Sequence, residues 1–367
     1  MEDKSKLNDR LYLLAISLIP EIRSDLILRL LNHFGSPESV WKADKKLLES
    51  VDGLGPATAE YISRERMKID PLPVWEKMQE MGIRLITRDD PEYPAGLLSI
   101  YDPPATLFIK GKILPGDSKA IAIVGSRKAS SYGLMTTRWL AGELARAGLT
   151  VLSGMARGVD SYAHLGALEA NGRTIAVMGC GLDLVYPPEN KKLKERIEKS
   201  GASISEYPPG TPPLAWHFPA RNRIISGMSL GVIITEAGEK SGALITADQA
   251  LEQGKEVFAV PGNIRIKSHR GTHKLIKEGA KLIQGVEDVL EELGIPLLNT
   301  IYNEEGKSSL TPDEERVLKH LDYEEVELEQ LLDMTGMPVN EVSAILMMLE
   351  ARGLIQRLPG NTYIKID

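Results

Sequence analysis

Six short apolar segments that alternate with helical stretches constrain the fold of this chain more than any other feature. They lie between residues 119 and 293, and each is β-branched or apolar throughout, as in strands covered on both faces. This alternation predicts a Rossmann-like α/β domain with a doubly wound, mostly parallel sheet. The predicted strands are 121–125, 150–154, 174–179, 202–206, 231–237 and 256–262, and the clearest helices are 131–147, 158–170 and 243–253.

The 367 residues suggest two or three domains, and three regions differ in pattern. Helical spacing of apolar residues over 11–68 predicts an N-terminal helical domain. Residues 107–113 (LFIKGKI) are expected to add a strand or hairpin that leans on the sheet. The predicted divisions are a helical domain over 1–84, the Rossmann-like domain over 85–295, a linker over 296–309 and a C-terminal domain over 310–367.

Composition narrows the setting in which the chain works. The sequence has a single cysteine, Cys180, which excludes an internal disulfide and most cysteine metal sites. The first residues are polar and charged, and no apolar stretch is long enough for a membrane span, so a cytoplasmic protein is expected. The net charge is −7, but residues 301–367 contribute −8 and residues 86–300 contribute +2. A basic patch in the middle of the chain must therefore come from local clustering.

The turn Gly125-Ser126-Arg127 directly follows the first predicted strand of the alternating region and precedes a helix. Free backbone N–H groups and a helix dipole at this point favour a bound anion. A nicotinamide cofactor is not expected, because Arg127 stands where the dinucleotide fingerprint needs its second glycine. The next strand also ends in Ser153-Gly154 instead of an acidic residue for the ribose. The turn is therefore interpreted as a grip for phosphate that uses an arginine fork.

Two further clusters follow predicted strands or precede helices. Ser153, Asp160 and His164 suggest a hydrolase, but the nucleophile-elbow motif is absent and His164 is better explained as a packing residue. Trp216 and Phe218 stand beside a basic run. Together they suit single-stranded nucleic acid, although core aromatics with surface arginines explain the same pattern equally well. The basic run consists of two arginines, Arg221 and Arg223, which flank the amide of Asn222.

Several other motifs carry weaker signals. The loop 236–242 resembles a P-loop superficially but lacks its Gly-Lys-Ser/Thr ending, and Ser241-Gly242 can simply cap a helix. The lysines at 191–194 fit a solvated helix face, with the alternative that one of them reaches the sheet's ligand crevice. His269 and His273 lack further ligands at metal spacing. Neither a metal nor a cofactor is predicted.

The two terminal domains resemble DNA-binding modules, but their charges weigh against that use. Residues 52–59 (DGLGPATA) form a helix-hairpin-helix pattern, which can present N–H groups to DNA phosphates or serve only for packing. Residues 313–321, 326–335 and 339–352, followed by a β-wing, form a winged-helix pattern. Its presumed recognition helix carries Glu341 and Glu350. Binding in a DNA groove is therefore disfavoured, and a protein-docking or vestigial role is expected.

A series of motifs across nearly the whole chain resembles the DNA-processing protein A family, DprA or Smf. The motifs include GSR at 125–127, LSGMARGVDSYAH at 152–164, TIAVMGCGLDLVYPPEN at 174–190, SEYPPGTPP at 205–213, FPARNRIISG at 218–227, TEAGEKSGALITADQA at 235–250 and VFAVPG at 257–262.

The resemblance implies a homodimeric, non-enzymatic recombination mediator. It would protect incoming single-stranded DNA and load RecA recombinase onto it during natural transformation. Carried over residue by residue, the implied DNA site is Gly125, Ser126, Arg127, Ser153, Gly154, Lys191, Phe218, Arg221, Asn222 and Arg223. The rival prediction is a nucleotide-handling enzyme related to lysine-decarboxylase-like phosphoribohydrolases, which would use Glu236. The glycine-rich loop of those enzymes is missing here.

Overall fold

The computed structural model describes residues 4–296, 310–321, 325–351 and 354–365. A nine-stranded sheet runs through its centre in the order β1-β2-β6-β5-β4-β3-β7-β8-β9. Strands β3 to β9 pair with one another in parallel, and β1 and β2 form an antiparallel edge in which β2 pairs with β6. The strands are β1 (Ile83–Thr87), β2 (Thr106–Gly111), β3 (Ala120–Val124), β4 (Thr150–Ser153), β5 (Thr174–Met178), β6 (Ala202–Ser205), β7 (Gly231–Ile234), β8 (Glu256–Ala259) and β9 (Lys281–Leu282).

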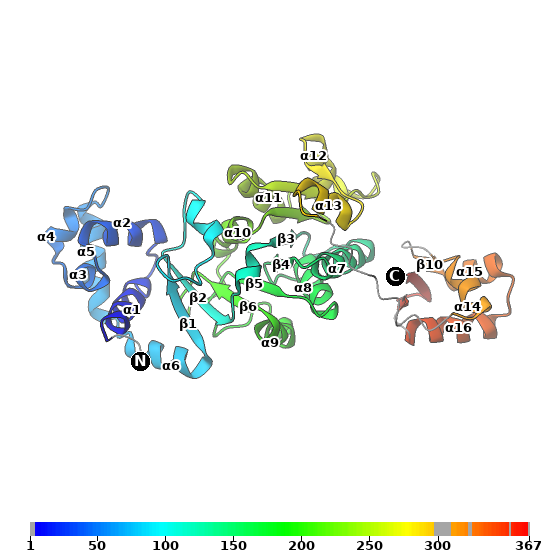
Figure 1. Ribbon diagram of the computed structural model, residues 1–367, viewed down its shortest axis with the longest axis horizontal. Helices are drawn as coiled ribbons and strands as arrows, with labels where there is room; N and C mark the ends of the chain where they lie inside the picture. Colours follow the sequence, from blue (N-terminus) through cyan, green and yellow to red (C-terminus); the bar gives the residue numbers. More distant parts are fainter. Residues whose placement is uncertain (1–3, 297–309, 322–324, 352–353, 366–367) are drawn as a thin grey trace.

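Helices cover both faces of this sheet, as the two-sided apolar strands predict (Figure 1). Side chains alternate along β3: Ile121 and Ile123 pack on the face covered by α7, α8 and α13, and Ala122 and Val124 pack on the opposite face. The opposite face is covered by α10, α11 and α12. The helices are α7 (Ser131–Arg146), α8 (Val159–Glu169), α9 (Lys191–Ser200), α10 (His217–Gly227), α11 (Gly242–Glu252), α12 (Arg270–Lys277) and α13 (Val286–Glu292).

The doubly wound prediction is confirmed, and the sheet is wider than expected. The predicted extra strand becomes β2, which pairs with β6 and extends the sheet. Strand β1 begins at Ile83, two residues before the predicted start of the domain. It was missed because its five residues follow a helix after a single glycine, which leaves no separate turn signal. The predicted linker lies almost entirely in 297–309, outside the described residues.

The N-terminal helices pack against the antiparallel edge of the sheet and share one apolar cluster with it. Leu14 and Leu30 lie in this cluster together with Phe108 of β2. The predicted hairpin joins α4 to α5, where Gly53 has φ +72° and Gly55 caps α5. These helices are α1 (Lys4–Ser17), α2 (Ser24–Phe34), α3 (Pro37–Lys42), α4 (Lys45–Glu49), α5 (Pro56–Glu65) and α6 (Leu72–Met81).

The C-terminal domain is a winged helix with its own apolar core. Helices α14 (Pro312–Leu318), α15 (Leu328–Thr335) and α16 (Val339–Ala351) pack on a three-stranded sheet ordered β10-β12-β11. The strands are β10 (Val326–Glu327), β11 (Ile355–Leu358) and β12 (Thr362–Lys365). Glu341, Met347, Met348 and Glu350 of α16 are all exposed, so this helix presents an acidic and apolar surface. Within the described ranges, no helix is long and apolar enough to cross a membrane.

Candidate nucleic-acid interface

A groove opens at the carboxyl edge of the sheet, where the chain reverses its direction of winding. The crossovers after β3 lead outward through β4 and β5 to β6, and the chain then returns to place β7 on the other side of β3. Loops that leave neighbouring strands in opposite directions at such a point leave a crevice for ligands. We call this hollow of about 520 Å³ the switch-point groove. Its polar lining comprises Ser126, Arg127, Lys128, Asp160, Asn222, Ser241 and Thr246.

Arg127 and Phe218 meet at the mouth of the groove. Arg127 is exposed, and its guanidinium carbon lies 5.3 Å from the centre of the half-buried Phe218 ring. This distance is typical of a cation–π contact. The Phe218 ring also lies 5.4 Å from the ring of Tyr186, between centroids. Arg127 and Phe218 both line a second, smaller hollow beside the groove, together with Arg157 and Tyr186. The site thus combines an exposed cation with aromatic faces.

The turn that carries Arg127 is held rigidly by its own backbone. The Ser126 amide donates to the backbone oxygen of Glu236 at 2.7 Å, and the Ser126 carbonyl accepts from the amide of Val159 at 3.2 Å. The Lys128 amide donates to the Ser126 hydroxyl at 3.1 Å. A side chain at Gly125 would come within 2.8 Å of both Val159 and Glu236, so only glycine fits here. The turn therefore holds the Arg127 and Lys128 side chains out at the groove.

One part of the phosphate-grip interpretation is wrong. The helix that follows the turn, α7, does not offer a free N-terminus, because the carboxylate of Glu236 already lies there. The Ser130 amide donates to its two oxygens at 3.0 and 3.2 Å, and the Ser130 hydroxyl donates to it as well. The anion expected from outside is thus supplied by the chain itself. At this turn, the exposed side chains of Arg127 and Lys128 remain for an external phosphate.

Three of the predicted site residues are buried and do not line the switch-point groove. Ser153 is fully buried, and its hydroxyl donates to the carbonyl of Ile123 at 2.6 Å. Arg221 is 3% exposed and donates to the carbonyl of Gly154 at 2.8 Å. Burial lowers the pKa of Arg221 to about 10, against the favourable effect of Asp160. Ser153 and Arg221 therefore support the loops of the site from within the protein, and Gly154 lines the second hollow beside Arg127 and Phe218.

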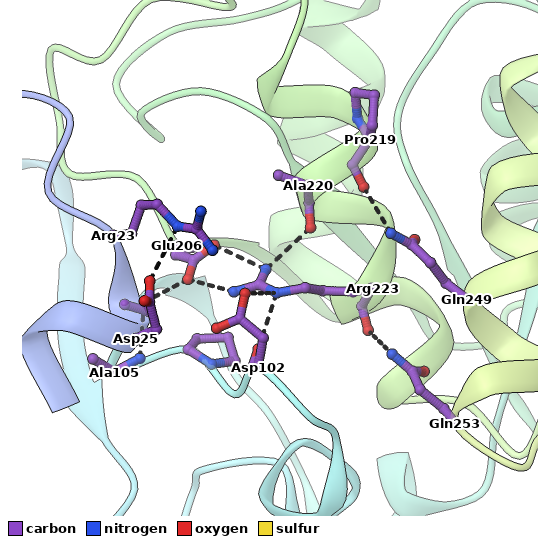
Figure 2. A network of polar contacts seen from close by, with 12 residues as sticks. Arg23, Asp25, Asp102, Ala105, Glu206, Pro219, Ala220, Arg223, Gln249 and Gln253 are labelled. Carbon is purple, nitrogen blue, oxygen red and sulfur yellow. Dashed lines mark hydrogen bonds and ion pairs between the residues drawn. The ribbon is translucent and has the colours of Figure 1, made fainter. Parts of the chain in front are cut away.

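Arg223 points away from the groove into a polar network between the sheet domain and the N-terminal helices (Figure 2). Its Nη1 and Nη2 atoms donate to the carboxylate of Glu206 at 2.9 and 2.6 Å, and its Nε atom donates to the carbonyl of Asp102 at 2.9 Å. Glu206 also accepts from the hydroxyl of Ser24 on α2 at 2.5 Å. The expectation of a phosphate contact did not include this pairing, because the fold brings Glu206 and Asp102 to Arg223 from 17 and 121 residues away.

The remaining predicted residues lie at or near the surface. Asn222 is half-buried in the groove lining, and its side-chain oxygen accepts from Arg221 at 3.3 Å. Lys191 is exposed at the first position of α9 and is not among the residues that line either hollow. The sequence interpretation assigned no role to Lys128 and Tyr186. Both could have been found from their place in loops that follow strands β3 and β5.

The hydrolytic alternatives lack a workable geometry. The Ser153 hydroxyl is bound to the sheet, and His164 is fully buried with its Nδ1 atom 2.6 Å from the hydroxyl of Thr174. The Glu236 carboxylate, which a phosphoribohydrolase would need at its substrate, is also fully buried. Among the described residues, no group of three or more His, Cys, Asp or Glu side chains is arranged to hold a metal ion.

His164 gives the fold a pH dependence that can be measured. Burial lowers the pKa of His164 from 6.5 to about 3. Below pH 6.5, His164 is therefore protonated in the unfolded chain but stays neutral in the folded chain. We expect the contribution of His164 to the free energy of unfolding to fall by about 1.4 kcal/mol per pH unit between pH 6 and 4. In H164Q this contribution is absent. Urea titrations of both proteins should show that their free energies of unfolding converge as the pH is lowered from 6 to 4. Parallel pH profiles would contradict the lowered pKa of His164.

Comparison with known proteins places this geometry in a family. Residues 84–294 match the family model "DNA recombination-mediator protein A", and residues 304–361 match the "DprA winged helix domain". Protein Smf of Synechocystis is 36% identical, covering 97% of this chain and 98% of its own length. DNA processing protein DprA of Bacillus subtilis is 43% identical over 72% of this chain and 91% of its own.

Two solved structures agree with this result. The X-ray structure of DNA processing protein A from Streptococcus pneumoniae aligns with a TM-score of 0.68 at 36% identity, covering 77% of this chain and 97% of that one. DNA processing protein A from Helicobacter pylori, a structure described for its single-stranded DNA binding mode, aligns with a TM-score of 0.52 at 32% identity. It covers 57% of this chain and 95% of that one. The chain therefore belongs to the DNA recombination-mediator protein A family.

Proposed function

We propose that this chain binds single-stranded DNA at the switch-point groove and acts there without catalysing a reaction. The observation that carries the proposal is the pairing of exposed Arg127 with the Phe218 ring at the mouth of the groove. Proteins that bind single strands combine cations along the backbone with aromatic faces on which bases stack. Lys128 adds a second cation beside Arg127, and Tyr186 adds a second ring beside Phe218.

In this proposal the bound strand is protected and RecA recombinase is loaded onto it during DNA uptake, and the chain works as a homodimer through its sheet domain. Family membership and the strand binding described for the Helicobacter pylori relative support this role. We propose the predicted division into a helical domain, a sheet domain, a linker and a winged helix, with the sheet domain beginning at β1 (Ile83) instead of residue 85. The winged helix is assigned no groove-reading role, because its exposed α16 surface is acidic.

Titration of fluorescein-labelled oligo-dT into the full chain, followed by anisotropy, tests this function. We expect binding that falls steeply as salt is raised, because phosphate neutralisation releases counterions. We also expect little preference among base sequences, since stacking tolerates every base. Incubation with nucleoside monophosphates should release no free base. Absence of strand binding at low salt, or release of base, would contradict the proposal.

Phe218→Ala separates stacking from charge in the same assay. We expect the affinity for oligo-dT to fall by about 1–3 kcal/mol, the usual loss for one stacked base. The slope of log affinity against log salt should stay unchanged, because no cation is removed. Phe34→Ala on α2, outside the groove lining, is the matched control. If the F218A protein binds as tightly as the unaltered chain, Phe218 does not stack a base.

A further inference from the structure

Glu236 lies where a Rossmann-like fold ordinarily binds a phosphate group. It follows β7, is fully buried, and accepts from the amide and hydroxyl of Ser130, the N-cap residue of α7. Helix α7 directly follows the turn after β3. A helix N-terminus in this position has N–H groups and a dipole that favour a negative charge. Here that charge is a side chain of the protein.

The fit around this carboxylate is close. A Cβ atom at Gly133, in the first turn of α7, would lie 2.2 Å from a Glu236 carboxylate oxygen and 3.1 Å from the Glu236 Cβ. The Ser130 hydroxyl also accepts from the Gly133 amide at 3.1 Å, which completes the cap. The backbone oxygen of Glu236 meanwhile holds the Ser126 amide at 2.7 Å. One residue therefore occupies the helix N-terminus and anchors the turn that carries Arg127.

We propose that Glu236 is a specificity-determining and positioning residue: its carboxylate fills the phosphate site of the fold and so excludes free nucleotides. The phosphate of a nucleotide cannot take this place while the Glu236 carboxylate lies against the first turn of α7 and accepts from the amide and hydroxyl of its N-cap residue, Ser130. At this turn a phosphate is met further out, by the exposed side chains of Arg127 and Lys128. An extended strand meets such exposed cations along its backbone, whereas a lone nucleotide loses its strongest anchor. The consequence for strands rests on the proposed function; the filled phosphate site does not.

Thermal unfolding of the full-length E236A protein in phosphate, and in sodium chloride of equal ionic strength, tests the filled site without any DNA. Removing the side chain opens the helix N-terminus, so inorganic phosphate should raise the Tm of E236A by at least about 3 °C more than chloride does. Thr137→Ala removes a buried hydroxyl from the same helix and leaves its N-terminus intact. The T137A and unaltered proteins should show no such difference. Equal responses in all three proteins would overturn the proposal.

E236Q keeps the volume of the side chain but removes its charge, which covers the case in which E236A does not fold. We expect its Tm to fall by roughly 2–8 °C, the effect of losing a charge at a helix N-terminus in a domain of this size. Phosphate should not restore it, because the site is still filled. An E236Q protein as stable as the unaltered chain, or one rescued by phosphate, would contradict the proposal.

A competition experiment then tests the consequence for strands. Millimolar dTMP should displace labelled oligo-dT from E236A at least about tenfold more effectively than from the unaltered chain. Equal displacement from both proteins would show that Glu236 does not discriminate. If the chain binds no strand while phosphate still stabilises E236A selectively, the proposed function fails and the filled phosphate site stands.

Discussion

Replacing Arg127 with alanine is expected to weaken binding of single-stranded DNA by about 10- to 100-fold, or roughly 1.5–3 kcal/mol, the usual value of a charge-assisted contact. Arg127 is exposed at the groove, and within the described ranges no carboxylate forms an ion pair with it. Its charge is therefore available to a phosphate. The turn itself should survive, because it is held by backbone bonds of Ser126 and by Glu236.

The salt dependence makes this prediction specific. Loss of one phosphate contact should lower the slope of log affinity against log salt by somewhat less than one unit for a single strand. R127K should retain the slope and lose part of the affinity, because an ammonium group lacks the planar face that stacks on Phe218. R196A, which removes an exposed arginine of α9 outside the groove lining, is the control. Unchanged affinity in R127A would remove the turn from the DNA site.

Replacing Glu206 with alanine is expected to lower the free energy of unfolding by about 3–5 kcal/mol, with a fall in Tm on the order of 10 °C. The Glu206 and Arg223 side chains are 13% and 11% exposed, so the alanine variant leaves a largely buried guanidinium without its main partner. Although burial acts to lower it, the pKa of Arg223 is raised by Glu206 and Asp102. The Ser24 hydroxyl of α2 loses its acceptor in the same variant.

Glu169→Ala provides the matched control for this stability change. Glu169 forms an ion pair with Arg138 in which both side chains are more than one third exposed, and such pairs contribute about 0–1 kcal/mol. Differential scanning calorimetry of the two variants should therefore show a large shift for E206A and a small one for E169A. Similar shifts would mean that the network in Figure 2 does not stabilise the join between the helical domain and the sheet.

The sheet was predictable because its signal is local. Each inner strand is apolar on both faces and is followed by a helix with its own period, so β3 to β8 could be placed within a few residues. Strand β1 was not predictable in this way. It pairs with β2 across a separation that sequence spacing does not report, and only Gly82 divides it from α6.

The sequence predicts the site residues that lie at the surface better than those that are buried, because the partners of a buried side chain depend on the fold. Arg127 lies in the loop that follows strand β3, and Phe218 lies in the first turn of helix α10. Both residues line the groove. Arg221 and Arg223 look equally basic in the sequence, yet one is bound by strand-end carbonyls and the other by Glu206. Glu236 stands over a hundred residues from Ser130 in the sequence. Only the fold shows that its carboxylate lies at the N-terminus of α7.

Photo-crosslinking of oligo-dT that carries 4-thiothymidine to the full chain, followed by peptide mapping, tests most directly whether the switch-point groove holds the strand. We expect crosslinked peptides that contain Phe218 or Tyr186, the rings at the mouth of the groove. The yield should fall as salt is raised, and it should fall in R127A at equal protein concentration. Crosslinks confined to the hairpin loop at 52–55 or to α16, with none in the groove, would contradict strand binding at the switch-point groove.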